Sequence, residues 1–220
     1  MTRALSATDR AYTETKRSIL DGHLVGGDVI TEGQISTLLG ISRTPVREAF
    51  LRLQSEGLLQ LYPKRGAVVV PVEPSEVFAV MEAREIIESF AITKLLTEHA
   101  RVPRTVIESL WALVGEMTQA LHAQDPQRFA IADAEFHQAL VATSANPFLD
   151  QLAASLTERL WRFMPRVGRA ERLESAYREH IQLVEWIERG DLDATLAALR
   201  SHLRAGLMAL TGRPPRGTEK

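Results

Sequence analysis

The sequence predicts a mainly α-helical protein, with an N-terminal winged helix-turn-helix of three helices plus a β-hairpin wing and a C-terminal all-α bundle of six or seven helices. Three observations predict this fold class. Helical apolar periodicity covers most of the 220 residues. Two short β-prone runs flank a Pro/Gly turn ahead of residue 70. Two prolines, Pro71 and Pro74, then form a stiff, extended connection.

These features set the expected domain boundaries. We expect the winged helix-turn-helix over residues 1–72, a linker over 73–76, the helical bundle over 77–212 and a flexible tail over 213–220. In the N-terminal part we expect helices at 8–21, 32–39 and 45–57, and hairpin strands at 58–61 and 67–70.

The helix expected at 45–57 follows a turn at Gly40. Pro45 suits the first helical position, and the hydroxyl residue before it can cap the free amides of the first turn. Apolar residues recur behind it with helical spacing, at Val46, Ala49, Phe50 and Leu53. The helix should therefore bury one face and expose the opposite one.

The remainder of the chain is expected to form the bundle. Apolar periodicity predicts helices at 75–99, 103–123, 126–143, 147–165, 171–189 and 192–210. Proline and glycine interrupt the pattern at Pro103, Asp125-Pro126, Asn146-Pro147, Pro165 to Gly168 and Gly190-Asp191.

Composition excludes several classes of protein. The sequence contains no cysteine, so disulfides, thiolate metal sites and cysteine nucleophiles are excluded. Without a signal-peptide-like start or a long apolar stretch, we expect a soluble, cytoplasmic protein with no membrane partner. The net charge of -2 is unevenly distributed along the sequence, because residues 1–72 carry 9 Lys+Arg against 7 Asp+Glu. A basic N-terminal part on an acidic remainder fits DNA binding by a local patch.

The residues at the exposed start of the 45–57 helix are typical of a DNA-recognition helix. Arg43 and Arg47 are four residues apart, so both can enter one major groove, where arginine pairs with guanine. Thr44 and the free helix amides suit phosphate oxygens. Lys64 and Arg65, beside Gly66 at the hairpin tip, could reach the DNA backbone. The alternative is that these are ordinary solvated side chains.

A second set of residues has the composition of a metal site. Asp133 and His137 are four apart on one helix face, and His180 and His202 each lie beside apolar residues of other helices. Three imidazoles and a carboxylate converging in a bundle would suit Zn, Ni, Mn or Fe. The alternatives are hydrogen-bonded core histidines and an ordinary surface Asp–His pair.

The N-terminal part resembles the GntR family of bacterial transcription regulators over about residues 10–72. The resemblance is carried by Gly26-Gly27-Asp28, Glu32, Leu38-Leu39-Gly40-Ile41-Ser42-Arg43-Thr44-Pro45-Val46-Arg47-Glu48-Ala49, Leu53, Glu56-Gly57-Leu58 and Arg65-Gly66. It implies that the helix near Ser42 reads an operator and that the wing contacts DNA, with Arg43, Thr44, Arg47 and Gly66 as contacts. Gly26 stands where the family usually has proline, which we expect to loosen a turn only.

The C-terminal part resembles the FCD ligand-binding domain of the FadR subfamily over about residues 76–208. The matching pieces are Ala83-Arg84-Glu85-Ile86-Ile87-Glu88, Asp133 and His137, Asn146-Pro147, Tyr177-Arg178-Glu179-His180, Gly190-Asp191 and His202. The resemblance implies that Asp133 and the three histidines bind a divalent metal with open positions facing a small carboxylate effector.

Two further residues are candidates for the effector pocket. Arg84 interrupts an apolar helix stripe, and its guanidinium could bind an effector carboxylate or pair internally with Glu88. Asn146 could line the same pocket, although asparagine before proline is also a common turn or helix cap.

These features together predict a homodimeric transcription regulator, controlled by a small organic acid, that binds a roughly palindromic operator. One alternative is a metal sensor in which the metal is the signal. The other is a metal-dependent hydrolase, which would need a general base. Glu135 points away from Asp133 and His137 by helical geometry, so we do not expect an enzyme.

Overall fold

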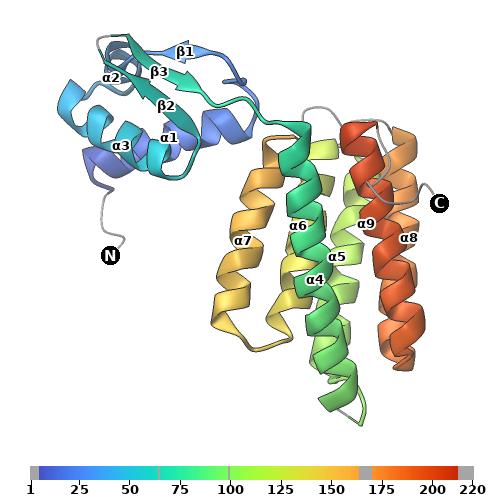
Figure 1. The fold of residues 1–220 in the computed structure, drawn as a ribbon. Helices are drawn as coiled ribbons and strands as arrows, with labels where there is room; N and C mark the ends of the chain where they lie inside the picture. Colours follow the sequence, from blue (N-terminus) through green and yellow to red (C-terminus); the bar gives the residue numbers. More distant parts are fainter. Residues whose placement is uncertain (1–4, 64, 99, 164–169, 213–220) are drawn as a thin grey trace. The chain divides into compact units, whose positions relative to one another are not determined.

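The chain forms two units, Met1–Glu73 and Pro74–Lys220, in the computed structural model. The structure describes residues 5–63, 65–98, 100–163 and 170–212. Figure 1 shows a small sheet with three helices in the first unit and a set of long helices in the second. This architecture confirms the predicted fold class.

The first unit alternates helices with short strands. Its elements are α1 (Ala7–Leu20), β1 (Val29–Ile30), α2 (Glu32–Leu39), α3 (Arg43–Ser55), β2 (Leu59–Tyr62) and β3 (Gly66–Val69). The apolar stripe of α3 is fully buried, as its spacing predicts. α3 packs against α1, α2 and β2, so the stripe forms the centre of this unit's core.

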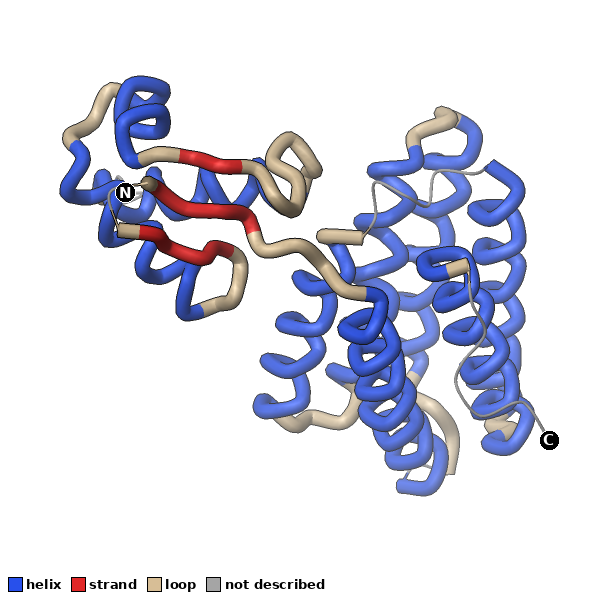
Figure 2. Tube along the Cα trace, turned by 45° about the horizontal axis from the view of Figure 1, so that its top comes forward, coloured by secondary structure: helices blue, strands red, loops and turns tan. Residues whose placement is uncertain are grey.

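The sheet contains one strand that the sequence did not predict. Its order is β1-β3-β2, and both pairs are antiparallel. β2 and β3 form the predicted hairpin, with Tyr62 opposite Gly66 (Figure 2). β1 has only two residues, which is too short to show an alternating pattern.

Two glycines allow close backbone approaches in this unit. Gly66 has a φ of 97°, and a Cβ there would collide with the carbonyl oxygen of Ile30. The wing therefore needs glycine at this position for its own conformation. A Cβ on Gly26 would lie 2.6 Å from the Cα of Pro71, so the expectation that Gly26 only loosens a turn is wrong.

The start of α3 corrects the predicted boundary. The helix begins at Arg43, two residues early, with Ser42 as its N-cap and Pro45 in the first turn. Proline is tolerated there because the first amides of a helix have no partner within it. Thr44, the hydroxyl residue expected to cap the helix, therefore lies inside it, and the side chain of Ser42, the N-cap residue, makes no capping hydrogen bond.

The second unit contains six helices within the described residues. They are α4 (Pro74–Glu98), α5 (Arg104–His122), α6 (Pro126–Ala142), α7 (Pro147–Trp161), α8 (Ala170–Arg189) and α9 (Leu192–Thr211). α4 begins inside the range 73–76 expected for the linker, because Pro74 suits a first helical turn. α7 ends four residues before the expected boundary at 165. Lys64, the break from Pro165 to Gly168 and the tail at 213–220 lie outside the described residues.

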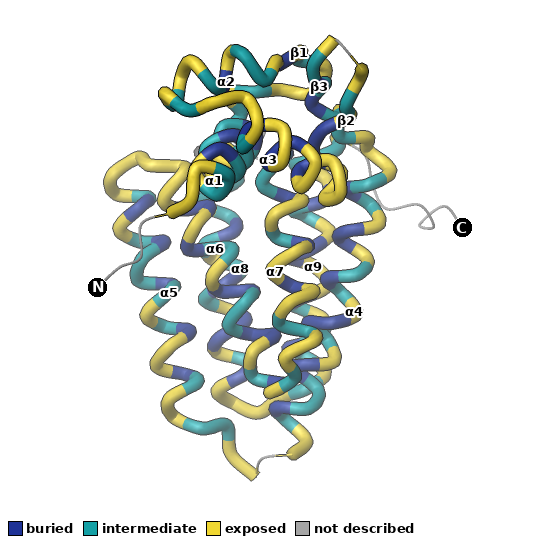
Figure 3. The backbone as a smooth tube through the Cα atoms, turned by 90° about the vertical axis from the view of Figure 1, so that its left-hand side faces the viewer, coloured by how far each residue is buried: buried dark blue, intermediate teal, exposed yellow. Residues whose placement is uncertain are grey.

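The bundle buries one face of each helix (Figure 3). α4 packs against α6, α7 and α9, whereas α8 packs against α5, α6 and α9. Among the apolar core, the buried polar side chains include Arg84, Glu88, His137, His180 and His202. In the part of the chain that the structure describes, no helix is long and apolar enough to span a membrane.

Candidate metal centre and nucleic-acid interface

Three helices of the bundle bring together the four residues that the sequence singled out as a metal set. Asp133 and His137 come from α6, His180 from α8 and His202 from α9. One potential ligand atom from each residue lies within 4.8 Å of all the others. The three histidines are buried and Asp133 is half-buried. A single ion could therefore reach all four side chains.

Within the described residues, one atom inside the cluster lacks the hydrogen-bond partner that buried polar atoms normally have. Nε2 of His137 and Nε2 of His202 face each other at 3.0 Å. Nε2 of His180 lies 3.4 Å from Oδ1 of Asp133, is buried and makes no hydrogen bond within the described residues. Two donors bound to one ion at about 2.0–2.1 Å would be separated by about 2.8–3.0 Å at octahedral angles and by about 3.3–3.4 Å at tetrahedral angles. The donor set and its spacing therefore fit a divalent metal.

The electrostatic environment keeps the imidazoles neutral. Burial lowers the pKa of His137 well below its ordinary value, and the positive charge of Arg84 lowers it further. Burial also lowers the pKa of His202 well below its ordinary value, and it lowers the pKa of His180. Neutral imidazoles can bind a metal at neutral pH without first losing a proton.

The acidic groups of the cluster respond differently to burial. Burial opposes ionisation of Asp133, but the attraction of its carboxylate to the three histidines in their protonated forms and to Arg84 outweighs burial and holds the pKa of Asp133 below its ordinary value. Burial dominates for Glu88 and raises its pKa, although Arg84 opposes this shift. Asp133 is therefore the carboxylate best suited to ligate a cation.

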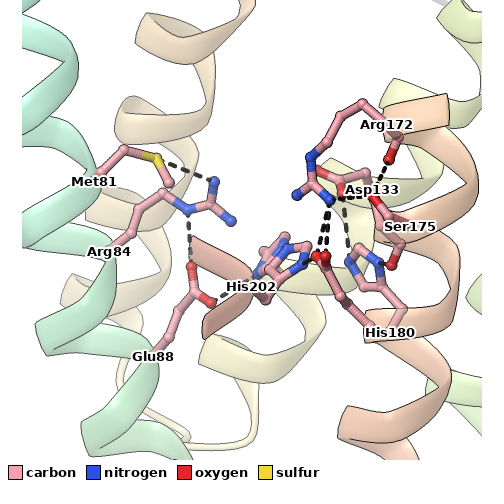
Figure 4. A network of polar contacts seen from close by, with 11 residues as sticks. Met81, Arg84, Glu88, Asp133, Arg172, Ser175, His180 and His202 are labelled. Atoms are coloured by element: carbon pink, nitrogen blue, oxygen red, sulfur yellow. Dashed lines mark hydrogen bonds and ion pairs between the residues drawn. The ribbon is translucent and has the colours of Figure 1, made fainter. Parts of the chain in front are cut away.

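An outer set of charged residues contacts the cluster (Figure 4). Glu88 from α4 lies 2.7 Å from Nδ1 of His137, and Glu179 from α8 lies 2.7 Å from Nδ1 of His202. Glu88 was expected only as a partner of Arg84, and no role was predicted for Glu179 or Arg172. The seven-residue spacing of Arg172 and Glu179, which places both on one face of α8, is the signal that could have found them.

The two effector-pocket candidates have different surroundings. Arg84 is 9% exposed and donates from Nε to Oε1 of Glu88 at 2.8 Å, so the internal pair is present. Its Nη1 lies 4.0 Å from the sulfur of Met81. Asn146 caps α7, because its Oδ1 accepts from the amides of Phe148 and Leu149. Asn146 is thus a helix cap, which is one of the two roles expected for it.

At the start of α3, two exposed arginines lie beside the first turn of α2. A Cβ on Gly33 would be 3.6 Å from Nη2 of Arg43, so the guanidinium of Arg43 lies over this glycine. The side chain of Arg47 is 73% exposed, and its Nε is 4.0 Å from Oε1 of Glu32. Thr44 is exposed between them. These groups form a small basic surface at the N-terminal end of α3.

The other charged residues on the exposed face of α3 are bound to α1. Arg52 pairs with Asp9 at 3.0 Å and lies over the ring of Tyr12. Glu48 accepts a hydrogen bond from Thr8 at 2.8 Å. On the wing, Arg65 is exposed beside Gly66. Arg43 and Arg47 are therefore the arginines of α3 that remain available to a partner.

Comparison with protein families assigns both parts of the chain. Residues 7–69 match the model of the bacterial regulatory proteins of the gntR family, and residues 79–205 match the FCD domain. The second match alone covers more than half of the sequence. Both matches confirm the resemblance inferred from the motifs.

Individual relatives agree with this assignment. An uncharacterized HTH-type transcriptional regulator in an unstable DNA locus of Streptomyces ambofaciens is 30% identical, over 88% of this chain and 80% of the relative. The gluconate operon transcriptional repressor of Bacillus licheniformis is 24% identical, over 88% of this chain and 80% of the repressor. The solved structure of E. coli McbR/YncC shares the fold, with a TM-score of 0.77 and 20% identity over 95% of this chain and 99% of that one.

These relatives decide between the classes of function that the sequence left open. They are transcription regulators, and Glu135, the acid considered as a general base, is exposed on α6. The hydrolase alternative is therefore set aside. The chain belongs to the GntR family of bacterial regulatory proteins and is a DNA-binding transcription regulator with an FCD domain.

Proposed function

We propose that this regulator binds a divalent metal at Asp133, His137, His180 and His202, and that a small carboxylate effector bound beside the metal controls operator binding. The observation that carries the proposal is the buried Nε2 of His180, which has no hydrogen-bond partner among the described residues and lies within a cluster of four ligand atoms. A buried polar atom without a partner is unfavourable unless a ligand or ion satisfies it.

The metal would supply a Lewis-acidic centre whose remaining coordination positions accept carboxylate oxygens. The four protein ligands all have nitrogen or oxygen donors, which suits Zn, Ni, Mn or Fe. Their role is to hold the ion inside the bundle, where α6, α8 and α9 meet.

Arg84 is the residue we assign to the effector carboxylate. Its Nε is occupied by Glu88, whereas its two Nη groups have no oxygen acceptor within the described residues. A buried guanidinium with free donors is suited to a carboxylate, which it can bind through two parallel hydrogen bonds. Asn146 is not included, because its side-chain oxygen already caps α7.

The DNA contacts are assigned to the N-terminal end of α3 and to the wing. Arg43 and Arg47 would contact base edges, and Thr44 would contact a phosphate. Lys64, Arg65 and Gly66 of the wing would follow the DNA backbone. Arg52 and Glu48 are bound to α1, which supports this choice because Arg43 and Arg47 make no such contact with α1 in the described residues.

Chain connectivity offers a route between the two sites. Arg84 lies on α4, and α4 begins at Pro74, only five residues after β3 ends at Val69. An effector that displaces α4 would therefore act directly on the connection to the DNA-binding unit. Such coupling needs only about 1–3 kcal/mol.

A homodimer is part of the proposal, because two identical DNA-binding units would match the two half-sites of a roughly palindromic operator. Large apolar side chains support it: Ile86 and Phe90 share one face of α4 and are 65% and 50% exposed. Phe148 and Leu152 on the adjacent α7 are 80% and 42% exposed. Sedimentation equilibrium should give twice the chain mass, and the chain mass alone would contradict this assignment.

The experiment that tests the effector proposal is a thermal-shift screen of small mono- and dicarboxylates and sugar acids, gluconate included, with metal present. A ligand that binds only the folded state raises the melting temperature. A carboxylate that raises the melting temperature should also change the operator affinity of the wild-type protein. Arg84→Lys should reduce this change in operator affinity. Metal-dependent operator binding that no organic acid alters would favour the metal-sensor alternative instead.

A further inference from the structure

Two of the four candidate metal ligands are each held by a glutamate, and each glutamate is held by an arginine. We infer that Glu179 and Glu88 are positioning residues that orient His202 and His137 for the metal, and that Arg172 and Arg84 fix these two carboxylates in place. The inference rests on the proposed metal centre and assigns roles to residues outside its ligand set.

The first of these chains of contacts runs from α8 to α9. Oε2 of Glu179 is 2.7 Å from Nδ1 of His202. Nη1 of Arg172 donates to both oxygens of Glu179, each at 3.0 Å, and to the hydroxyl of Ser175 at 2.9 Å. Arg172 therefore holds both oxygens of the Glu179 carboxylate, and this carboxylate in turn orients the ring of His202. Figure 4 shows Arg172 and His180 on one side of His202 and Arg84 with Glu88 on the other.

The second chain of contacts runs from α4 to α6. Glu88 is 1% exposed and uses one oxygen for each neighbour. Its Oε2 is 2.7 Å from Nδ1 of His137, and its Oε1 accepts from Nε of Arg84 at 2.8 Å. The Nη groups of Arg84 take no part in this contact, so positioning His137 and binding an effector use different edges of the guanidinium.

His180 is held in the same way by the backbone. Its Nδ1 lies 2.7 Å from the carbonyl oxygen of Ala176, one turn earlier in α8. A carbonyl can only accept a hydrogen bond, as can an ionised carboxylate. With both carboxylates ionised, each of the three rings carries its proton on Nδ1 and directs the lone pair of Nε2 into the cluster.

This arrangement has a direct electrostatic consequence. The Nε2 lone pairs of His137 and His202 face each other at 3.0 Å, where they repel unless a cation lies between them. The glutamates hold both rings in this orientation and make the ring nitrogens more basic. Without them the rings could turn, and the metal would have to order them on binding.

The test uses zinc as the probe and Glu179 as the first site, because this side chain is less buried than Glu88. Zinc affinity of the full chain is measured by competition with a chromophoric chelator. Glu179→Ala should weaken it by about 10- to 100-fold, and Glu179→Gln, which keeps an acceptor, should lose less. Glu174→Ala is the matched control, because Glu174 is an exposed residue of α8 that pairs only with Arg178 in the described residues.

A second measurement separates positioning from general damage to the fold. Long-range ¹H–¹⁵N NMR of the metal-free protein should show His202 and His137 as Nδ1–H tautomers, and Glu179→Ala should abolish this preference at His202 alone. Wild-type zinc affinity in Glu179→Ala, or a proton on Nε2 of His202 in metal-free wild type, would overturn the inference while leaving the metal centre standing. Failure of wild type to bind any zinc would overturn both.

Discussion

Nε2 of His137 and Nε2 of His202 lie 3.0 Å apart, although each ring has a glutamate on its other nitrogen. When both rings carry their protons on Nδ1, the two facing nitrogen lone pairs repel each other at this distance, and a cation bound to both nitrogens would remove the repulsion. The burial that lowers the pKa of both histidines makes a shared proton a poor source of this positive charge at neutral pH. This relationship is the physical basis of the proposed metal centre.

The lowered histidine pKa values predict that the metal-free bundle loses stability as pH falls. In the unfolded chain each histidine titrates near pH 6.5. Because their pKa values are lower in the folded state, the stability present above pH 6.5 is lost as pH falls toward those values. Glu88, whose pKa is raised by burial, acts in the opposite sense. The slope should reach roughly 1.4 kcal/mol per pH unit for each net proton.

Urea unfolding of chelator-treated protein at pH 7.5, 6.5 and 5.5 measures this slope. All three tryptophans, Trp111, Trp161 and Trp186, lie in the bundle, so their fluorescence reports on that unit alone. His180→Asn should reduce the slope of unfolding free energy against pH by about 1.4 kcal/mol per pH unit, which is the contribution of one proton. An unfolding free energy that stays constant from pH 7.5 to 5.5 would show that the histidines titrate normally.

Arg84→Ala should destabilise the bundle strongly. The substitution leaves Glu88 buried without its partner, which typically lowers the free energy of unfolding by about 3–5 kcal/mol. Arg200→Ala is the control, because Arg200 on α9 pairs with Glu85 on α4 at 3.2 Å and the two side chains are 49% and 36% exposed. It should lower the free energy of unfolding by less than about 1 kcal/mol. Equal effects in tryptophan-monitored urea unfolding would mean that Arg84 is not held as a buried ion pair.

Arg47→Ala should weaken operator binding by about 1–3 kcal/mol, because it removes a base contact from the start of α3. The operator can be selected from a random duplex library, and affinities compared in gel-shift assays at one salt concentration. Arg104→Ala removes the same charge from an exposed position of the bundle and should have no such effect. If Arg47→Ala binds as wild type does, the assignment of the reading surface fails.

The fold was largely predictable because each helix carries its own apolar period. The positions of Val46, Ala49, Phe50 and Leu53 placed the core of the DNA-binding unit, and Asp133 with His137 placed half of the candidate site. In contrast, β1 consists of only two residues and depends on pairing with β3. A strand of that length has no periodicity of its own.

The positioning residues could not be predicted for a different reason. Glu179 directly precedes His180 in the sequence, yet its carboxylate contacts His202 on α9. Adjacent residues in a helix point about 100° apart, so only the packing of α8 against α9 reveals the contact. The sequence likewise offered Arg84 as the only partner of Glu88, because His137 reaches it from 49 positions away.

Metal content is the most direct test of the central claim. Protein purified without chelators and analysed by inductively coupled plasma mass spectrometry should contain about one divalent ion per chain. His180→Ala should contain almost none, whereas His122→Ala, at an exposed histidine of α5, should match wild type. Wild-type protein without metal, or His180→Ala with full occupancy, would contradict the account.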